Sequence, residues 1–160
     1  MQVALRQATF ADALRVATLL IETRLQCMPY APCAYSDDEV RAWVASELVP
    51  SAGVTVAEHD GQVIGVVATA REAQASWITQ MAVDPATLGR GIGSALLAHV
   101  MHSLTPPIRL FTFQANSGAR RFYERHGFVA VRFSDGQANQ EHCPDVLYER
   151  IYAHLKPLQE

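Results

Sequence analysis

The residues with the clearest chemical potential lie in the segment "MAVDPATLGRGIGSALLAHVMHSL", which runs from Met81 to Leu104. Gly89, Gly91 and Gly93 fill three of five consecutive positions, immediately before an apolar run with helical periodicity. Glycine leaves the backbone amides open to a ligand, and a helix N-terminus adds partial positive charge. Arg90, between two of the glycines, can add a charge-assisted hydrogen bond. The turn therefore indicates an anion site, although glycines can also serve only to shape a tight turn.

Two common phosphate-binding motifs do not fit this turn. A dinucleotide fingerprint needs a third glycine where this chain has Ser94 or Leu96, and an acidic residue about twenty positions later, where it has "RLFTFQ". A P-loop needs Gly-Lys followed by Ser or Thr, and the sequence contains no such combination. The glycines alone leave open another phosphate ligand, an unrelated nucleotide-binding domain, or a purely structural turn.

The elements that must position this turn follow from the apolar periodicity. A strand over residues 2–7 precedes a helix capped by Thr9. A second helix begins at the capping box of Ser36 and Glu39 and ends at Pro50. Its apolar face is predicted to consist of Val40, Trp43, Val44 and Leu48. A hairpin turns at Asp60 and Gly61, and a central strand covers residues 77–83. Further elements are a helix from Ile92, a strand "IRLFTF", a helix "SGARRFYERHG" and two strands "FVAVRF" and "DVLYERIY". This order predicts an α/β domain.

Composition narrows the function classes. The 160 residues are 49% apolar and 18% charged with a net charge of -3, which is typical of a globular protein and gives no basic face for nucleic acid. No leader sequence or membrane-spanning run is apparent, so we expect a cytoplasmic protein without a membrane partner. Cys27, Cys33 and Cys143 lack CxxC spacing, so neither a disulfide framework nor a metal site is expected. The alternative is a metal site built from His142 and Cys143 together with Cys27 and Cys33.

The motifs resemble the acyl-CoA N-acyltransferase superfamily, usually abbreviated GNAT. Its central motif is a strand ending in a segment like "AVDP", followed by Q/R-x-x-G-x-G/A at a helix start, and this chain has "MAVDPATLGRGIGSALL". The segment "NSGARRFYERHGF" is similar to the family's "N..A..FYE..GF", and "RQATFADALRVATLL" to its opening strand and helix. The resemblance covers nearly all of the chain. It implies one GNAT acetyltransferase domain over residues 1–160, with a mixed, mostly antiparallel sheet of about six to seven strands, splayed at its centre and flanked by about four helices.

The resemblance also implies a coenzyme A site. Met81, Ala82 and Val83 align with the strand end whose backbone pairs with the pantetheine arm, where one amide would stabilise the oxyanion of a tetrahedral intermediate. Asn116 aligns with an asparagine that contacts the pantetheine region, and it can also serve as a helix N-cap. The turn implied to hold the pyrophosphate comprises Gly89, Arg90, Gly91, Ile92, Gly93 and Ser94. We therefore expect acetyl-CoA as co-substrate and no metal.

Tyr123 aligns with the tyrosine that the family uses as general acid. When an amine attacks the thioester, the departing thiolate needs a proton, and a phenol can donate one. Tyr123 is therefore the predicted catalytic residue and a coenzyme contact, unless it only packs among Phe122 and Phe128.

Two positions depart from the family pattern. Leu88 replaces the usual Gln or Arg before the glycines, so we expect packing to hold that part of the turn. Gln80 stands on the central strand where many relatives have a glutamate, and an amide cannot accept a proton at neutral pH. The remaining candidates for the general base, each of which can also be an ordinary surface charge, are Glu72, Asp37, Glu141 and His142, acting directly or through water.

The acceptor side is implied to lie at two long loops, "CMPYAPCAYS" and "SDGQANQEHCPD". Met28, Tyr30, Tyr35, Asp37 and Asp38 would make a mixed apolar and acidic pocket there, which suits a small amine. The sequence thus predicts an N-acetyltransferase for a small-molecule or peptide amine, and the alternative is a non-catalytic acyl-CoA binding domain. Relatives are often homodimers, and the last strand is the predicted place for such contact.

Overall fold

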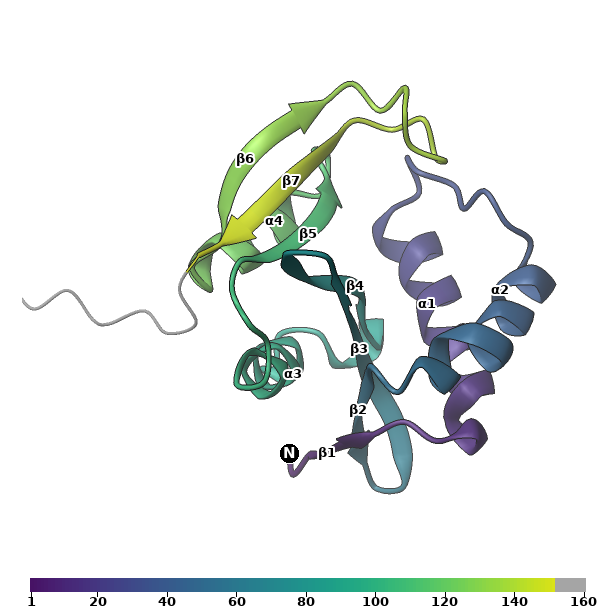
Figure 1. Cartoon of the computed structure of the whole chain (residues 1–160). Coiled ribbons are helices and arrows are strands. Elements are labelled where there is room, and N and C mark those ends of the chain that lie inside the picture. The colour runs from purple at the N-terminus through teal and green to yellow at the C-terminus, as the bar shows by residue number, and fades with distance from the viewer. Residues whose placement is uncertain (152–160) are drawn as a thin grey trace, which may run out of the picture.

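The fold, taken from a computed structural model that describes residues 1–151, is a seven-stranded sheet with helices on both faces (Figure 1). The helices are α1 (Ala13–Cys27), α2 (Asp37–Trp43), α3 (Ile92–Met101) and α4 (Ser117–Arg125), and the strands are β1 (Ala4–Gln7), β2 (Val54–His59), β3 (Gln62–Glu72), β4 (Ala75–Val83), β5 (Ile108–Phe113), β6 (Val129–Ser134) and β7 (Asp145–Arg150). Their order and type confirm the predicted fold. Tyr152, at the end of the predicted last strand, lies outside the described residues.

The sheet divides between β4 and β5. The strand order is β1-β2-β3-β4-β5-β7-β6, and every neighbouring pair is antiparallel except β4 and β5. These two strands pair only at Ser76 with Ile108 and Trp77 with Arg109, although β4 continues to Val83 and β5 to Phe113. The backbone edges of β4 and β5 beyond Trp77 and Arg109 are therefore not paired with each other, and the predicted splay at the centre of the sheet is confirmed.

A β-bulge in β4 changes which side chains face each layer of helices. Ala68 of β3 pairs with Gln80 and Thr69 with Ile78, so Thr79 is an extra residue in β4. Ile78 consequently faces the core beneath α3, whereas Ala82 faces the core beneath α1. Met81 lies between these positions on the α3 side, where it packs partly against that core.

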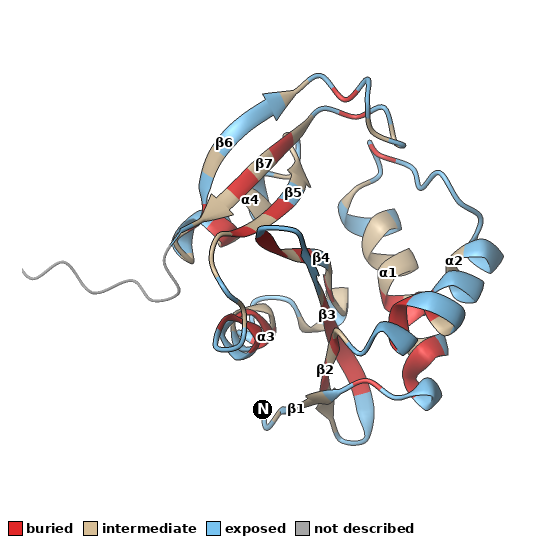
Figure 2. Ribbon diagram, viewed as in Figure 1, coloured by how far each residue is buried: buried red, intermediate tan, exposed pale blue. Residues whose placement is uncertain are grey.

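Two hydrophobic cores fix the helices on opposite faces (Figure 2). One contains Leu96 and Leu97 of α3 together with Tyr123 of α4 and Leu110 of β5, so α3 and α4 share a face. The other joins α1 to β2, β3 and β4. Helix α3 can lie close to the sheet because β3 carries Gly65, where an added Cβ would stand 2.9 Å from the Leu96 Cδ1 atom.

The second helical segment differs from its prediction. The capping box of Ser36 and Glu39 is present, but α2 ends at Trp43 and residues 44–48 form a π-helical segment. A π turn holds more residues than an α turn, so the 3.6-residue periodicity is interrupted. That periodicity is the basis for predicting Trp43 and Val44 on the same apolar face. Val44 is buried and Trp43 is 37% exposed, which corrects the predicted apolar face. Helical structure also continues past Pro50 to Ser51.

Candidate functional site

The glycine turn forms the approach to α3. Gly89 and Gly91 have φ angles of 79° and 78°, and no atom lies within 4 Å of an added Cβ at either position. The first helical hydrogen bond runs from the Ala95 amide to the Gly91 carbonyl, 3.0 Å away. The amides of the residues between them, Ile92, Gly93 and Ser94, come before this bond and have no partner within regular helix geometry. The turn is thus a backbone that only glycine adopts readily, ending in free donors.

The residues flanking the glycines are exposed. Arg90 is exposed, and none of the hydrogen bonds or ion pairs among residues 1–151 involves its guanidinium group. Leu88 is 57% exposed, so the expectation that packing would hold this part of the turn is wrong. Leu88 directly follows the 3-10 turn of Pro85–Thr87 in the segment that joins β4 to α3.

The segment before the turn is held by Asp84 of the "AVDP" motif. Its Oδ1 accepts a hydrogen bond from the Ala86 amide at 3.0 Å, and its Oδ2 pairs with the Arg15 guanidinium at 2.9 Å. The Arg15 Nε also donates to the Val63 carbonyl. These contacts tie α1, β3 and the start of the turn together, so this aspartate has a structural role that the sequence did not reveal.

The end of β4, the turn and α4 meet at one cluster. An added Cβ at Gly93 would lie 3.5 Å from the Phe122 ring and 3.7 Å from the Met81 Cε atom. The Tyr123 hydroxyl donates to the Met81 sulfur at 3.6 Å. Three segments far apart in sequence thus converge where β4 has left β5, and they include the predicted residues Met81, Gly93 and Tyr123.

Burial controls the acidity of Tyr123. The side chain is 9% exposed and packs edge-on against Phe122 and Phe128, with ring centroids 5.2 and 5.8 Å away. Loss of water around the phenolate raises the pKa of Tyr123 to about 12. The phenol therefore keeps its proton across the physiological pH range, which a proton donor requires.

Asn116 caps α4. Its side-chain oxygen accepts a hydrogen bond from the Ala119 amide at 3.1 Å, which confirms the N-cap interpretation. The residue follows β5 directly, on the opposite side of the splay from Met81.

The four candidates for the general base lie in different places. Glu72 is paired with Ala75 at the beginning of β4, about 17 Å along the sheet from Met81, since Met81 pairs with Val67, five residues from Glu72 on β3. Asp37 is an exposed residue in the first turn of α2, and His142 is exposed. Glu141 is half-buried, and its Oε1 lies 3.5 Å from the Arg24 Nη2 of α1.

Arg24 connects Glu141 to the open ends of the strands. Its guanidinium carbon stands 5.5 Å above the Phe113 ring at the end of β5, and Tyr30 meets the same ring edge-on at 6.2 Å. Residues of the loop before β7 and of the loop after α1 therefore lie close to the end of this strand, and that they form the acceptor side stays a prediction. Tyr35, also predicted there, is 48% exposed, and Asp38 pairs with Arg41 of its own helix.

Comparison with known proteins adds to this geometry. A family model described as "Acetyltransferase (GNAT) domain" matches residues 50–130, which include the glycine turn, Asn116 and Tyr123. The chain belongs to the GNAT acetyltransferase family. The PaiA N-acetyltransferase of Thermoplasma acidophilum, solved in complex with coenzyme A, has the same fold, with a TM-score of 0.74 at 17% identity over 95% of this chain and 100% of that one.

Curated relatives of this GNAT domain differ in extent. The chain is 36% identical over 87 residues to a mycothiol acetyltransferase of Acidimicrobium ferrooxidans, covering 49% of this chain but only 28% of that relative. It is 28% identical over 127 residues to the peptidyl-lysine N-acetyltransferase YiaC of Escherichia coli, covering 79% of this chain and 84% of the relative. The names of these two relatives give different acceptors.

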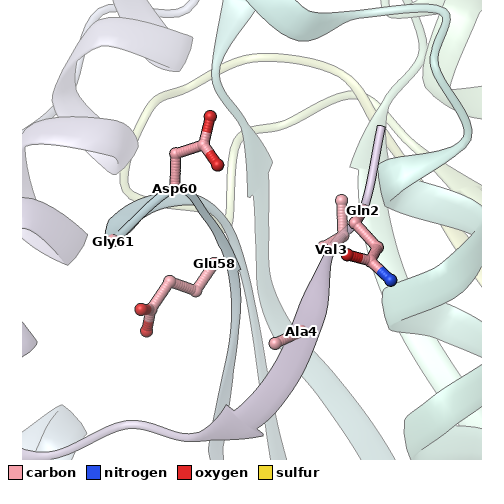
Figure 3. A pocket seen from close by; sticks show the side chains of 6 residues that line it. All are labelled: Gln2, Val3, Ala4, Glu58, Asp60 and Gly61. Carbon is pink, nitrogen blue, oxygen red and sulfur yellow. The ribbon is translucent and has the colours of Figure 1, made fainter.

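A separate pocket of about 390 Å³ lies at the sheet edge, between β1 and the turn from β2 to β3 (Figure 3). Glu58 and Asp60 line it, and the lining residues include none of the predicted site. The Glu58 carboxylate there is paired with the Arg6 guanidinium at 2.7 Å.

Two further observations concern residues 1–151 alone. No three His, Cys, Asp or Glu side chains in this part gather closely enough to hold a metal ion. Among its helices, none has the length and apolar character needed to cross a membrane.

Proposed function

We propose that this GNAT domain transfers the acetyl group of acetyl-CoA to the primary amine of an acceptor by direct attack of the amine on the thioester. The observation that carries the proposal is the hydrogen bond from the Tyr123 hydroxyl to the Met81 sulfur, at the place where the glycine turn and β4 meet. In the reaction, the amine nitrogen bonds to the acetyl carbon, the carbon–sulfur bond breaks, and Tyr123 gives its proton to the departing thiolate.

The coenzyme would lie along the splay. The amides and Arg90 of residues 89–94 would hold its pyrophosphate, and the backbone of Met81, Ala82 and Val83 would pair with its pantetheine arm. This β4 backbone is paired with β3 but is free of β5 beyond Trp77, which leaves the amides that point away from β3 available to the thioester oxygen. Asn116 would contact the arm from the other strand.

Glu141 is the candidate base that we favour for deprotonating the amine. It is held by Arg24 near the end of β5, whereas Glu72 lies about 17 Å from Met81 along the sheet at ordinary strand rise. A carboxylate at this place can take the proton of the amine directly or through water. The acceptor itself is proposed to be a small molecule, although the peptidyl-lysine relative makes a peptide amine the natural comparison.

A second candidate is a non-catalytic acyl-CoA binding domain. The observation that favours it is Gln80, which occupies the central strand where many members of the family have a carboxylate. The two functions predict the same ligand and differ only in turnover.

Release of free coenzyme A over a panel of amines tests both. The exposed thiols of Cys27 and Cys33 would react with thiol reagents, so CoA should be quantified by chromatography. We expect acetyl-CoA-dependent CoA release with at least one amine and its loss in Tyr123→Phe. Binding of acetyl-CoA without release from any amine would favour the non-catalytic candidate, and no binding would contradict both.

A further inference from the structure

Four aromatic side chains gather on the α1 side of the splay. Trp77 of β4 stacks on Phe111 of β5 with ring centroids 5.6 Å apart and an interplanar angle of 18°. Tyr30 meets Phe113 edge-on at 6.2 Å. We call these four residues the aromatic surface.

Strand alternation puts the members of this surface on one face. Ile108 and Leu110 of β5 are buried in the core beneath α3, so the intervening Phe111 and Phe113 point to the opposite face. Arg24 of α1 lies over Phe113, which identifies that face as the α1 side. Helix α1 packs on β3 and β4 rather than covering β5 (Figure 1). Phe111 therefore remains 51% exposed.

The aromatic surface borders the splay from the α1 side, whereas the Met81 and Tyr123 side chains lie on the α3 side of the sheet. Trp77 and Arg109 are the last paired residues of β4 and β5, so the Trp77–Phe111 stack closes the narrow end of the splay. Phe113 lies four residues beyond Arg109, about 13 Å along β5, and Met81 lies about 10 Å beyond Trp77, because Thr79 is an extra residue in β4. Phe113 is thus within about one residue of the level of the Met81 sulfur that accepts the Tyr123 hydrogen bond, and Phe111 lies about 7 Å back along β5.

The charges around this surface are already paired. Arg109 Nε lies 2.8 Å from Glu149 Oε2, and Arg24 Nη2 lies 3.5 Å from Glu141 Oε1. A ligand that approaches the rings therefore meets flat apolar area flanked by neutralised ion pairs, and recognition rests on stacking rather than on a free charge.

We propose that the aromatic surface selects the acceptor, and that the preferred acceptor is a small primary amine joined by a short alkyl linker to an aromatic ring. The inference rests on the proposed acetyl transfer. With the ring against Phe111, a short linker brings the amine level with Phe113 and Glu141, where attack on the thioester would occur. Aromatic pairs gain from offset or edge contacts beyond the area that they bury, and an aliphatic amine lacks this gain.

The first test compares matched amines. Purified protein with acetyl-CoA is given 2-phenylethylamine and tryptamine, against 2-cyclohexylethylamine, spermidine and a lysine-containing peptide. We expect kcat/KM for the aromatic amines to exceed that for each of the others by about tenfold or more. A higher value for the polyamine, the peptide or the cyclohexyl compound overturns the acceptor assignment and leaves acetyl transfer intact. Absence of acetyl-CoA binding overturns acetyl transfer and this inference with it.

The second test uses variants. Phe111→Ala should raise KM for 2-phenylethylamine about tenfold, with little change in kcat and with acetyl-CoA affinity retained, which also shows that the variant is folded. Phe10→Ala is the control, because Phe10 is 75% exposed and lies outside the aromatic surface, before α1. Unchanged KM in Phe111→Ala contradicts the proposal. If the protein is a dimer that Phe111→Ala converts to a monomer while KM stays unchanged, the proposal is also contradicted, because the aromatic surface would then serve self-association.

Discussion

The Tyr123 hydroxyl of α4 donates its hydrogen bond to the sulfur of Met81 on β4, 3.6 Å away. A thioether is a weak acceptor, so the buried phenol has a partner that it can exchange for a better one. A thiolate leaving at the same place would be such a partner. Burial meanwhile raises the pKa of Tyr123 to about 12, which keeps the proton in place until a strong acceptor forms.

Tyr123→Phe should lower kcat by about 10²-fold or more while acetyl-CoA affinity changes less than threefold, because general acid catalysis contributes on this scale. Phenylalanine keeps the ring contacts with Phe122 and Phe128, so the fold should be retained. Quantified CoA release gives kcat, and calorimetry gives the affinity. The control is Phe10→Leu, because Phe10 is 75% exposed before α1 and belongs neither to the proposed coenzyme site nor to the aromatic surface. Retention of a third or more of wild-type kcat in Tyr123→Phe would remove this tyrosine from the mechanism.

Gly91→Ala should weaken acetyl-CoA binding about tenfold and lower the free energy of unfolding by about 1 kcal/mol, because alanine at a φ of 78° is strained. A shift in the turn would also misdirect the amides that follow it. Binding is measured by calorimetry and stability by urea denaturation.

Gly61→Ala is the matched control for that variant. Gly61 has a φ of 75° in the turn between β2 and β3, with open space around an added Cβ. Both variants should lose similar stability, and only Gly91→Ala should lose affinity. Equal affinities in the two variants would show that the glycine turn does not bind the coenzyme.

The helices and strands of this chain could be predicted because each has a local sequence pattern that specifies it. Alternation in β2 and β3, the Asp60–Gly61 turn and the capping box at Ser36 each specify an element on their own, and the structure has all of them. The glycines at 89 and 91 announced a turn with positive φ angles. Such features depend on neighbours within a few residues, which a sequence displays directly.

Contacts between segments that are distant in the sequence could not be predicted in the same way. The exposure of Leu88, the π-helical segment after Trp43 and the pairing of Asp84 with Arg15 all depend on what the fold brings nearby. The aromatic surface joins residues from a loop and two strands. Alternation in "IRLFTF" indicates two of its four residues, because it places Phe111 and Phe113 on one face of the strand. Their partners Trp77 and Tyr30 could be found only from the tertiary structure.

Leu88→Gln should tighten acetyl-CoA binding two- to fivefold without a measurable loss of stability. The side chain is 57% exposed, so its replacement leaves no cavity, and an amide beside the glycine turn adds a hydrogen-bonding group of the kind usual in the family. Calorimetry and urea denaturation give the two quantities. The control is Leu14→Gln in α1, which is 67% exposed and lies on another element. Weaker binding in Leu88→Gln than in Leu14→Gln would mean that the leucine itself contacts the coenzyme.

Asp12 provides a prediction for the acid range. Hydrogen bonding from the Arg6 guanidinium, opposed by burial, lowers the pKa of Asp12 from 3.8 to about 2, and the Thr9 amide adds a further bond to the same carboxylate. Between these two pH values the unfolded chain binds more protons than the folded chain. The contribution of Asp12 is therefore complete above about pH 5 and is lost as the pH falls toward 2.

Asp12→Asn should accordingly lower the free energy of unfolding by about 2 kcal/mol at pH 7, and the difference from wild type should shrink at pH 4 and further at pH 3. Urea denaturation at these three pH values measures it. Asp38→Asn is the control, because that side chain is 95% exposed and pairs only with Arg41 of the same helix, where salt and water screen the interaction. A gap for Asp12→Asn that stays constant from pH 7 to pH 3 would show that the loss comes from packing around Thr9 and not from the charge that Arg6 stabilises.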